Sequence, residues 1–426
     1  MTHWEEITIQ DLVLAGEAEV KTGPFGTQLH ASDYVDEGIP VINVRNIGFG
    51  DIKTQNLEYI SEHTAARLAS HLLQNNDIVF GRKGAVERHV FIKKAHVRWF
   101  QGSDCLRLRI NSRRVNPRFV SYRLLCEDHK QWMMNQCSHG ATMSSLNQDI
   151  VKRILLKLPP FLVQHKIVSI LSAYDDLIKN NNHRIKILEE MTQTIYREWF
   201  VHFRFPGHEK VKMVDSPMGK IPEGWEVKSF TDIADVLSGG TPKTNVPEYW
   251  SGEIPFFAPV DAPNYFYVTK TEKFITQAGL HKCSSSLYEK DTVFITARGT
   301  VGKVIMAGKS MAMNQSCYAL VGKEGVSQPF LFFHTLNSVN QLRKSTGGAT
   351  FETIIIDTFR RLNVLSPSNR LIDRFSHMIK PSLDLMLNLT LNNELLRRTR
   401  DLLLPKLISG EVDVSELDIT VPEEAA

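Results

Sequence analysis

Residues Val163–Phe200 read VQHKIVSILSAYDDLIKNNNHRIKILEEMTQTIYREWF, with no glycine or proline to interrupt a helix. At about 1.5 Å per residue, this run can form a helix of about 50 Å. Its apolar residues recur at heptad spacing, which is typical of a coiled-coil seam. The seam predicted on this helix consists of Leu171, Ile178, Ile185, Leu188 and Ile195.

A second run, Leu371–Leu407, also lacks glycine and repeats leucine at a spacing of seven, and its predicted seam consists of Leu389, Leu396 and Leu403. Polar residues also lie on or beside the two seams, where a buried amide fixes register at a cost in stability. They are Asn181, Thr192, Asn392 and Asn393. We predict that the two helices pair as an antiparallel coiled coil, with ordinary packing of amphipathic helices against a core as the alternative. We expect Leu383, Leu387 and Ile187 to be exposed on the outer faces.

The rest of the chain repeats itself. The matched pairs are Gly140-Ala141-Thr142 with Gly348-Ala349-Thr350, Asp149 with Asp357, Pro159 with Pro367, Gly38-Ile39-Pro40 with Glu253-Ile254-Pro255, and Asp77–Phe80 with Asp291–Phe294. The first three pairs share one offset, and the offset drifts upstream as loop insertions would cause. The period is far longer than that of solenoid repeats, so the sequence predicts two copies of one large unit.

Each copy begins with short β-branched or aromatic runs separated by Gly, Asn and Pro, which predict strands, and then a helix. The predicted strands include Ile39–Val44, Ile78–Phe80, Val293–Thr296 and Ser316–Val321, and the predicted helices include Pro117–Gln136 and Gln328–Ser345. The predicted fold class is α+β, with two tandem α/β domains separated and joined by two long helices in an antiparallel coiled coil, as a pseudo-two-fold internal repeat.

The predicted boundaries are 1–160 for the first α/β domain, 161–205 for a central helical spacer, 206–367 for the second α/β domain, 368–412 for a C-terminal helical spacer and 413–426 for an acidic tail. The junction after the first helix is rich in Pro and Gly. We expect Trp225 and Phe230 to seat the second domain.

The composition is that of a globular chain, with 42% hydrophobic and 23% charged residues and a net charge of +3. No run approaches the ~20 apolar residues of a membrane helix, and the start of the chain lacks the features of a signal peptide, so we expect a cytoplasmic protein without membrane contact. The cysteines are odd in number and include no Cys-x-x-Cys, which favours reduced thiols. The net charge neither requires nor excludes a polyanionic partner, and the strong local excess of basic over acidic residues in Arg82–Arg123 favours one only in part.

The motifs of common catalytic sites are missing from the sequence. Leu158 stands where an adenine methyltransferase needs Asn or Asp before Pro159-Pro160-Phe161, and leucine cannot accept a hydrogen bond from the amine. Gly299–Lys303 lacks the spacing of a phosphate-binding loop. Zinc ligands are a minor alternative for Cys126, His129, Cys137 and His139, because no standard ligand spacing occurs. We therefore predict no catalytic residue and no metal site on this chain.

A set of short fragments carries a family resemblance. The fragments are Pro159-Pro160 with Gln164, Trp199-Phe200 with Phe205-Pro206-Gly207, Met218–Trp225, Ser238–Pro242, Arg298–Lys303 and the closing Leu403–Val412. In this order and at these spacings, the chain resembles the specificity (S) subunits of type I restriction-modification systems over nearly its whole length. The first unit matches least, because Gly23-Pro24-Phe25-Gly26 replaces the Gly-Gly-Thr-Pro loop of the second.

The resemblance implies that each α/β domain is a target recognition domain that reads one half of a bipartite, asymmetric sequence in double-stranded DNA. It also implies that the paired helices set the distance between the half-sites. Family members carry no chemistry and no cofactor of their own. Their partners are two methyltransferase (modification) subunits, which bind S-adenosylmethionine, and through these two motor-nuclease (restriction) subunits, which use ATP and Mg, in a complex for phage defence.

Base edges in the major groove are read by Arg or Lys at guanine and by Asn or Gln at adenine. We therefore expect DNA-binding residues on loops marked by glycine, with a solvated surface charge or a loop cap as the alternative for each. The candidates are Arg45, Asn46, Arg82, Lys83 and Arg88 in the first unit and Lys243, Arg298, Lys303, Asn314 and Gln315 in the second. The Arg82 and Arg298 loops are favoured because they recur beside a glycine. His139–Thr142 and Gly347–Thr350 could also approach the DNA backbone, or could be turns that need positive φ.

Two other functions remain open at this point. A coiled-coil scaffold or adaptor that binds only protein partners is the main alternative, and the basic segment argues against it. A standalone nuclease built on Asp215 and Glu226-Val227-Lys228 is weaker, because these residues lie in the junction at a permissive spacing. Salt-dependent DNA binding separates the first alternative from the DNA-reading function.

Overall fold

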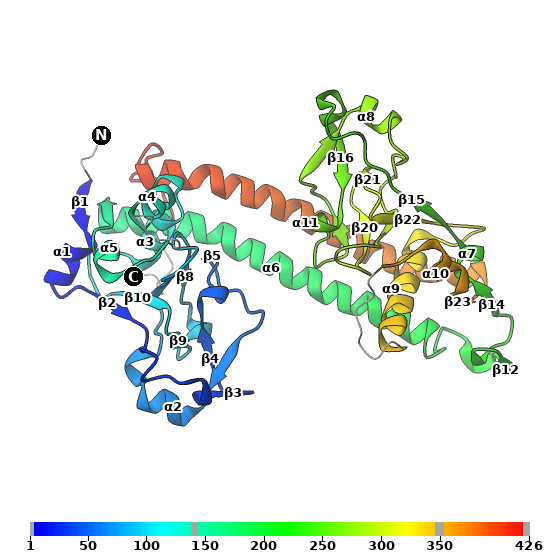
Figure 1. The fold of residues 1–426 in the computed structure, drawn as a ribbon, viewed down its shortest axis with the longest axis horizontal. Coiled ribbons are helices and arrows are strands. Elements are labelled where there is room, and N and C mark those ends of the chain that lie inside the picture. Colours follow the sequence, from blue (N-terminus) through cyan, green and yellow to red (C-terminus); the bar gives the residue numbers. More distant parts are fainter. Residues whose placement is uncertain (1–3, 138–143, 346–352, 421–426) are drawn as a thin grey trace. The chain divides into compact units, whose positions relative to one another are not determined.

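The structure is a computed structural model that describes residues 4–137, 144–345 and 353–420. The chain divides into two compact units, one formed by Met1–Asp176 with Leu396–Ala426 and the other by Leu177–Leu395. Each unit contains both helices and β-strands (Figure 1). Within the described ranges, no helix has the length and apolar character needed to cross a membrane.

The first unit is built around a five-stranded sheet with the strand order β2-β10-β7-β8-β5, whose bounds are Ala18–Thr22, Cys105–Ile110, Ile78–Gly81, His89–Phe91 and Phe49–Gly50. A four-stranded sheet has the order β3-β6-β4-β9, with bounds Tyr34–Val35, Glu58–Ile60, Ile39–Ile42 and Phe100–Gln101, and β1 (Glu5–Thr8) pairs with β11 (Leu155–Leu158). The shorter helices are α1 (Ile9–Leu14), α2 (Glu62–Arg67), α3 (Pro117–Leu124), α4 (Glu127–Cys137) and α5 (Gln148–Lys152). The central strand β7 is buried along its whole length, as its apolar sequence requires.

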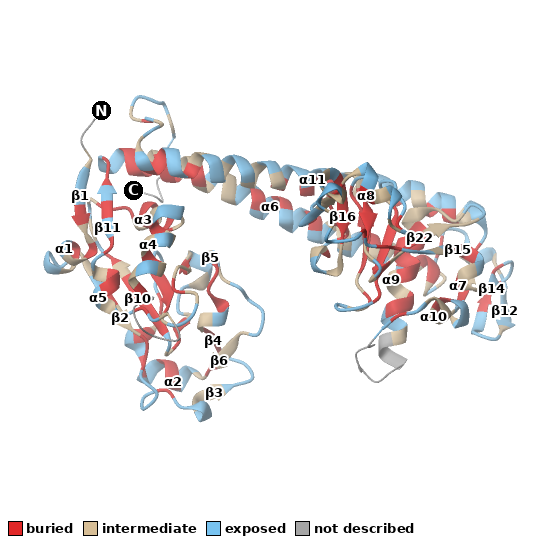
Figure 2. Cartoon of the chain, turned by 45° about the horizontal axis from the view of Figure 1, so that its top comes forward, coloured by how far each residue is buried: buried red, intermediate tan, exposed pale blue. Residues whose placement is uncertain are grey.

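The second unit has a five-stranded sheet with the order β15-β22-β19-β20-β17, whose bounds are Ala234–Ser238, Cys317–Gly322, Val293–Thr296, Val304–Ala307 and Tyr267–Val268. Its smaller sheets are β18-β16-β21 (Lys273–Ile275, Trp250–Phe257, Ala312–Met313), β14-β23 (Glu226–Ser229, Asn363–Ser366) and β12-β13 (Met213–Ser216, Gly219–Pro222). The shorter helices are α7 (Phe230–Ile233), α8 (Gln277–His281), α9 (Gln328–Ser345) and α10 (Ile356–Arg361). In both units the buried residues gather in the sheets and in the helix faces that cover them (Figure 2).

The two units share one topology, which confirms the predicted internal repeat. The five strands of each main sheet follow the same order, and the same pair of strands in each is parallel, β5 with β8 and β17 with β20. The predicted pair of Gly38-Ile39-Pro40 and Glu253-Ile254-Pro255 is correct, because Ile39 faces Ile60 in one sheet and Ile254 faces Ile275 in the other. The α+β fold class is thereby confirmed.

One part of the predicted repeat is wrong by a residue. Asn76 and Asp291 both have positive φ, +71° and +70°. The Asn76 amide donates to Ile92 O and the Asp291 amide to Ala307 O, each at 2.8 Å. Asp291 is therefore the counterpart of Asn76 and not of Asp77, because both serve the turn that precedes the central strand.

The predicted helix Pro117–Gln136 is also incorrect, since two helices, α3 and α4, occupy this stretch. The Leu125 amide bonds to Tyr122 O at 3.1 Å, so the backbone tightens at the end of α3. Arg123 makes two hydrogen bonds with the Asp128 carboxylate, at 2.7 and 2.6 Å, across the break. This ion pair holds the two helices at the break.

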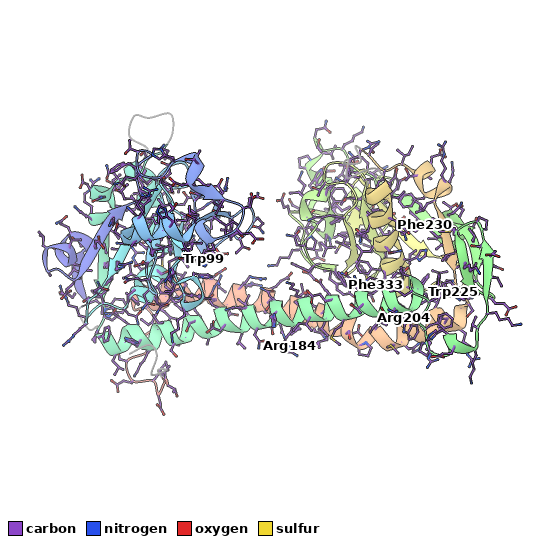
Figure 3. All side chains as sticks on the ribbon, turned by 90° about the horizontal axis from the view of Figure 1, so that it is seen from below. Trp99, Arg184, Arg204, Trp225, Phe230 and Phe333 are labelled. Atoms are coloured by element: carbon purple, nitrogen blue, oxygen red, sulfur yellow. The ribbon has the colours of Figure 1, made fainter. Side chains whose placement is uncertain are left out.

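An aromatic cluster forms the core of the second unit next to the junction. Trp225, which is buried, lies between the rings of Phe200 and Phe205, with centroid distances of 5.9 and 5.8 Å. Phe230 is fully buried and packs on Phe359 at 5.3 Å. Figure 3 labels Trp225 and Phe230 in this unit. As expected, both residues anchor the start of the second unit in its core.

Two long helices run through the structure as predicted. Helix α6 spans Phe161–Phe200 and α11 spans Asn369–Ser409, each slightly longer than the sequence indicated. Each helix contributes one end to each unit.

In the second unit, α6 and α11 are antiparallel. Asn181 Nδ2 donates to Asn393 Oδ1 at 3.0 Å, and further along α6 the Phe200 ring lies 5.0 Å from that of Phe375. Residue numbers therefore rise along one helix where they fall along the other. The Asn181 and Asn393 side chains are buried, with exposed fractions of 9% and 2%, whereas Asn392 is exposed. A buried amide pair of this kind fixes the register of two helices.

In the first unit, the same two helices meet through Asp175. Its carboxylate accepts hydrogen bonds from Arg400 on α11 at 2.7 Å and from Arg118 and Tyr122 on α3 at 2.9 and 2.7 Å. Burial alone would raise the pKa of Asp175, but the hydrogen bonds and the nearby guanidinium groups outweigh burial and lower the pKa. Asp175 thus joins both long helices to the sheet-bearing part of this unit.

The predicted seam residues differ in burial. Leu171, Ile178, Ile185 and Leu389 are buried, and Leu188, Ile195, Leu396 and Leu403 are half-buried. The expected exposure of Leu383 and Leu387 is wrong, because both are buried in the core of the second unit, at 2% and 4% exposure. Ile187 is exposed as expected. Part of α11 therefore serves as a core helix of the second unit.

Candidate nucleic-acid interface

Loops from three parts of the chain meet at one end of the strands of the main sheet in the first unit, and this end of the sheet is called its edge below. They are residues 23–26 after β2, 82–88 between β7 and β8, and 102–104 before β10. Backbone hydrogen bonds tie them together: Gly23 N donates to Cys105 O and Arg82 N to Asp104 O, both at 2.9 Å. This edge carries a continuous set of loops on a rigid sheet, as base readout requires.

The second unit repeats this arrangement. Gly239 N donates to Cys317 O at 3.4 Å and Ala297 N to Ser316 O at 2.8 Å. These bonds correspond one by one to those of the first unit, so residues 239–243, 297–303 and 314–316 form the equivalent edge. We call each set of loops the reading edge of its unit.

Two glycines hold each reading edge in shape. A Cβ on Gly23 would lie 2.0 Å from Gly102 O, and one on Gly239 would lie 2.1 Å from Asn314 O. Gly84 and Gly299 both have φ of +76°, and the following turn closes through Val86 N to Gly84 O at 2.9 Å and Val301 N to Gly299 O at 3.0 Å. The backbone conformation of these loops thus requires glycine at these positions.

The repeat of the favoured loops is shifted by one residue from the prediction. Since Gly84 matches Gly299, the counterpart of Arg298 is Lys83, and the counterpart of Arg82 is Ala297. The predicted recurrence of Arg82 with Arg298 is therefore wrong. Each unit still places a cation directly before the glycine of this loop.

The structure separates the candidates Arg45 and Asn46, which share a 3-10 turn at Val44–Asn46. Arg45 is half-exposed and pairs with Glu58 at 2.7 Å. Asn46 is fully buried, and its Nδ2 donates to Lys53 O at 2.9 Å and to Gln55 O at 3.2 Å. The Asn46 amide braces the loop, and in this conformation it has no access to a base.

The other candidates of the first unit lie on the reading edge. Lys83 is exposed, with its Nζ 3.3 Å from Asp104 Oδ1. Arg82 is half-buried, and among the described residues its Nε is enclosed without a hydrogen-bond partner. The Arg88 guanidinium lies 5.3 Å from the centre of the Phe49 ring and 3.5 Å from Glu87 Oε1.

In the second unit, Lys243 and Arg298 are exposed on the reading edge. Lys303 is occupied by its own unit, since its Nζ donates to Ala262 O and Asn264 Oδ1, both at 3.0 Å. The amide oxygen of Asn314 accepts a hydrogen bond from Ser316 N at 3.0 Å, and that of Gln315 accepts one from the Thr241 hydroxyl. The first two residues are therefore better placed for a ligand than the other three.

The basic excess of Arg82–Arg123 is largely neutralised inside the first unit. The ion pairs are Arg107 with Glu19 at 2.6 Å, Arg109 with Asp77 at 2.7 Å, Arg114 with Glu17 at 3.0 Å, Arg118 with Asp175 at 2.9 Å and Arg123 with Asp128 at 2.6 Å. The Arg107 side chain is 1% exposed. These five arginines thus serve ion pairs within the unit, which reduces the positive charge of the segment that could face a polyanion.

The possible zinc ligands Cys126 and His129 lie in the core. The pKa of the Cys126 thiol is raised by burial, and burial also lowers the pKa of His129 to about 4. The His129 ring stacks on Trp132 at 5.8 Å. His139 lies outside the described residues, as do the loops His139–Thr142 and Gly347–Thr350. Within the described part of the chain, no group of three or more His, Cys, Asp and Glu residues could hold a metal ion.

Comparisons with known proteins agree with the repeated architecture. A family model described as "Type I restriction modification DNA specificity domain" matches residues 1–190 and 222–370. The chain is 30% identical over 204 residues to the type I restriction enzyme MjaIX specificity subunit of Methanocaldococcus jannaschii, a match that covers 47% of this chain and 46% of that relative. The chain thus spans about half of that relative's length.

A longer match joins the chain to the type I restriction enzyme HindI specificity subunit of Haemophilus influenzae. It shows 22% identity over 405 residues and covers 81% of this chain and 88% of the relative. Among solved structures, the type I restriction-modification S subunit from M. genitalium superposes with a TM-score of 0.58 at 15% identity, over 95% of this chain and 96% of that chain. At this identity the superposition shows a common fold.

Proposed function

The chain belongs to the type I restriction-modification DNA specificity family, and we propose on this basis that it reads a bipartite, asymmetric sequence in double-stranded DNA. Each of its two units would read one half-site. The observation that carries the proposal is the duplicated reading edge, in which the same backbone bonds support the loops of both units. Two related but non-identical sets of loops suit an asymmetric target with two parts.

We further propose that the chain contributes recognition without catalysis. It would direct two methyltransferase subunits, and through them two motor-nuclease subunits, to the DNA site. S-adenosylmethionine, ATP and Mg would bind to those partners. Helices α6 and α11 would set the distance between the two half-sites, since a pair with a fixed register has a fixed length.

Lys83 and Arg298 are the first residues to test, because they are exposed equivalents on the two reading edges. The assembled methyltransferase complex with Lys83→Ala or Arg298→Ala should bind target DNA more weakly, by about two- to tenfold, with a smaller salt dependence. Lys186→Ala is the control, because Lys186 is an exposed lysine of α6 and belongs to neither set of loops. Fluorescence anisotropy with target and unrelated duplexes measures the effect.

The adaptor function predicts a different result. A scaffold that binds only proteins would leave the salt dependence of DNA binding unchanged in both variants. The neutralised basic segment is compatible with such a scaffold, so the loop cations decide between the two functions. Complexes that bind DNA equally well with and without both cations would remove the proposed function.

A further inference from the structure

The first unit exposes an aromatic ring beside its reading edge. Phe49 opens the edge strand β5, and 47% of its surface is exposed. In the parallel pair of β5 and β8, Phe49 faces His89, the first residue after the loop 82–88. Single exposed apolar side chains are common on protein surfaces, and what sets Phe49 apart is its position at the end of this loop.

The second unit has an aromatic residue at the same place. The parallel register pairs Tyr267 with Met306, and Tyr265 lies two residues before Tyr267, in the bend that leads into β17. Val304 faces Ile295 across the neighbouring strands as His89 faces Phe80. Tyr265 thus precedes the strand β17 that corresponds to β5, the strand of Phe49, and 39% of its surface is exposed.

A cation accompanies the aromatic residue in both units, although its partners differ. Arg88 and Lys303 are equivalent, since each directly precedes the strand after the loop. Arg88 lies 5.3 Å from the centre of the Phe49 ring. Lys303 instead bonds to Ala262 O and Asn264 Oδ1 at 3.0 Å, in the segment that ends in Tyr265. In each unit the cation thus fixes the segment that carries the aromatic side chain.

Phe49 also holds a second cation at the reading edge. Lys130 Nζ on α4 lies 5.1 Å from the centre of its ring. The carboxylates nearest to the two cations are Glu87, 3.5 Å from Arg88, and Glu127, 3.5 Å from Lys130. Both distances exceed the ~2.7–2.9 Å of a strong charge-assisted hydrogen bond, so both cations can bind phosphate in place of these partners.

The neighbouring imidazole adds no charge to this group. Burial lowers the pKa of His89 to about 3, with smaller contributions from His129 and Arg118, so the ring is neutral at physiological pH. Its Nε2 lies 2.9 Å from Ser121 Oγ in the core. The Phe49 ring is therefore flanked by two cations, each with one carboxylate beside it, and not by a charged imidazole.

We propose that Phe49 and Tyr265 are specificity-determining residues, one for each half-site, and that Phe49 reads the C5-methyl group of a thymine. The inference rests on the proposed function and names a contact within it. The phenyl ring has no hydrogen-bonding group, and the thymine methyl is the apolar feature that distinguishes a base pair in the major groove. Arg88 and Lys130 would hold the adjacent phosphates and so fix the ring against the base edge.

The test removes one methyl group at a time. The methyltransferase complex containing this chain is titrated with target duplexes in which single thymines are replaced by deoxyuridine. The unchanged protein should lose about fivefold in affinity at one thymine of one half-site, the value expected for one buried methyl group. Phe49→Ala should bind the thymine and deoxyuridine duplexes equally at that position and keep all other preferences.

Matched variants separate readout from folding. Phe49→Leu keeps an apolar contact and should retain part of the methyl discrimination. Leu14→Ala removes a more exposed side chain, 76% exposed, at the end of α1 and should change nothing. Tyr265→Ala should alter the base preference of the other half-site alone.

Two results would overturn the inference while the proposed function stands. One is a protein that selects its target sequence but shows no methyl effect at any thymine. The other is a Phe49→Ala complex that keeps the full methyl effect. Failure of the proposed function looks different, because the unchanged complex would then not distinguish target from unrelated DNA.

Discussion

The backbone around Gly23 leaves no room for a side chain. A Cβ at this position would lie 2.0 Å from Gly102 O, which is backbone and cannot move aside cheaply. Gly23→Ala should therefore lower the free energy of unfolding by about 1–3 kcal/mol through overpacking. Urea unfolding followed by circular dichroism measures the change.

Gly26 in the same loop is the matched control. A Cβ on Gly26 has no atom within 4 Å, so Gly26→Ala should be nearly neutral. Equal losses in the two variants would show that the loop tolerates neither substitution for a reason other than the close approach at Gly23.

Glu189 makes the stability of the second unit depend on pH. Its Oε1 accepts a hydrogen bond from Phe266 N at 2.8 Å, and burial raises the pKa of this carboxyl from 4.5 to about 7. The folded protein binds the proton more tightly than the unfolded chain does. The resulting stabilisation is complete below the unfolded pKa and is lost as pH rises through about 7.

Glu189→Gln should remove that dependence, because the amide stays neutral and its oxygen can still accept from Phe266 N. Between about pH 5 and pH 8, the variant should lose about 1–2 kcal/mol less stability than the unchanged protein, a figure reduced for partial exposure. Glu253→Gln is the control, since Glu253 is an exposed carboxylate of the same unit and is not among the groups that shift the pKa of Glu189. A pH profile unchanged by Glu189→Gln contradicts the assignment.

Single residues were the hardest part to predict from the sequence. The sequence shows the excess of basic residues in Arg82–Arg123, but it does not show which carboxylates pair with them. Some of these carboxylates lie far away in sequence, as Glu19 does from Arg107. Asn46 was predicted to contact a base because Asn side chains commonly bind adenine. In the structure its amide instead donates a hydrogen bond to Lys53 O in its own loop. Phe49 gave no signal, because its neighbours Arg88 and Lys130 meet only in the fold.

The helices and central strands were predicted well for a physical reason. Helix α6 carries its periodicity over many turns, so its existence did not depend on any one contact. Strand β19 was predicted with its full bounds, Val293–Thr296, because a buried central strand is apolar throughout. The break between α3 and α4 was missed because no Gly or Pro marks it.

The register of α6 and α11 predicts how spacing is controlled. One heptad of seven residues is inserted after Asn180 in α6, and another is inserted in α11 beside Asn393. Both helices become longer, and the buried amides of Asn181 and Asn393 stay in register. By helical rise alone, the tolerated spacer between half-sites should grow by about three base pairs. Mapping methylated sites in cells that carry the variant measures the spacer.

An insertion elsewhere provides the comparison. The same seven residues placed in the turn at Pro217–Met218, between β12 and β13, should leave the spacer unchanged. A new base preference at constant spacer in the helix variant would contradict the role proposed for the helices.

The duplicated topology was the strongest prediction for the chain as a whole. Internal matches such as Ile39-Pro40 with Ile254-Pro255 survived in the sequence because the same strand must pair in the same way in both units. The loops between these strands have diverged, and a reader of an asymmetric target requires that divergence. The repeat therefore indicates the architecture, while under the proposed function the loops would determine which bases are recognised.

Exchange of one α/β domain tests the central claim most directly. Residues 206–367 are replaced by the same segment of a family member that recognises another sequence, and methylated adenines are mapped across the genome of cells expressing the chimera with its methyltransferase subunits. If each unit reads its own half-site, one half of the methylated motif will change to that of the donor while the other half remains. A motif in which both halves change together, or in which neither changes, would contradict the account.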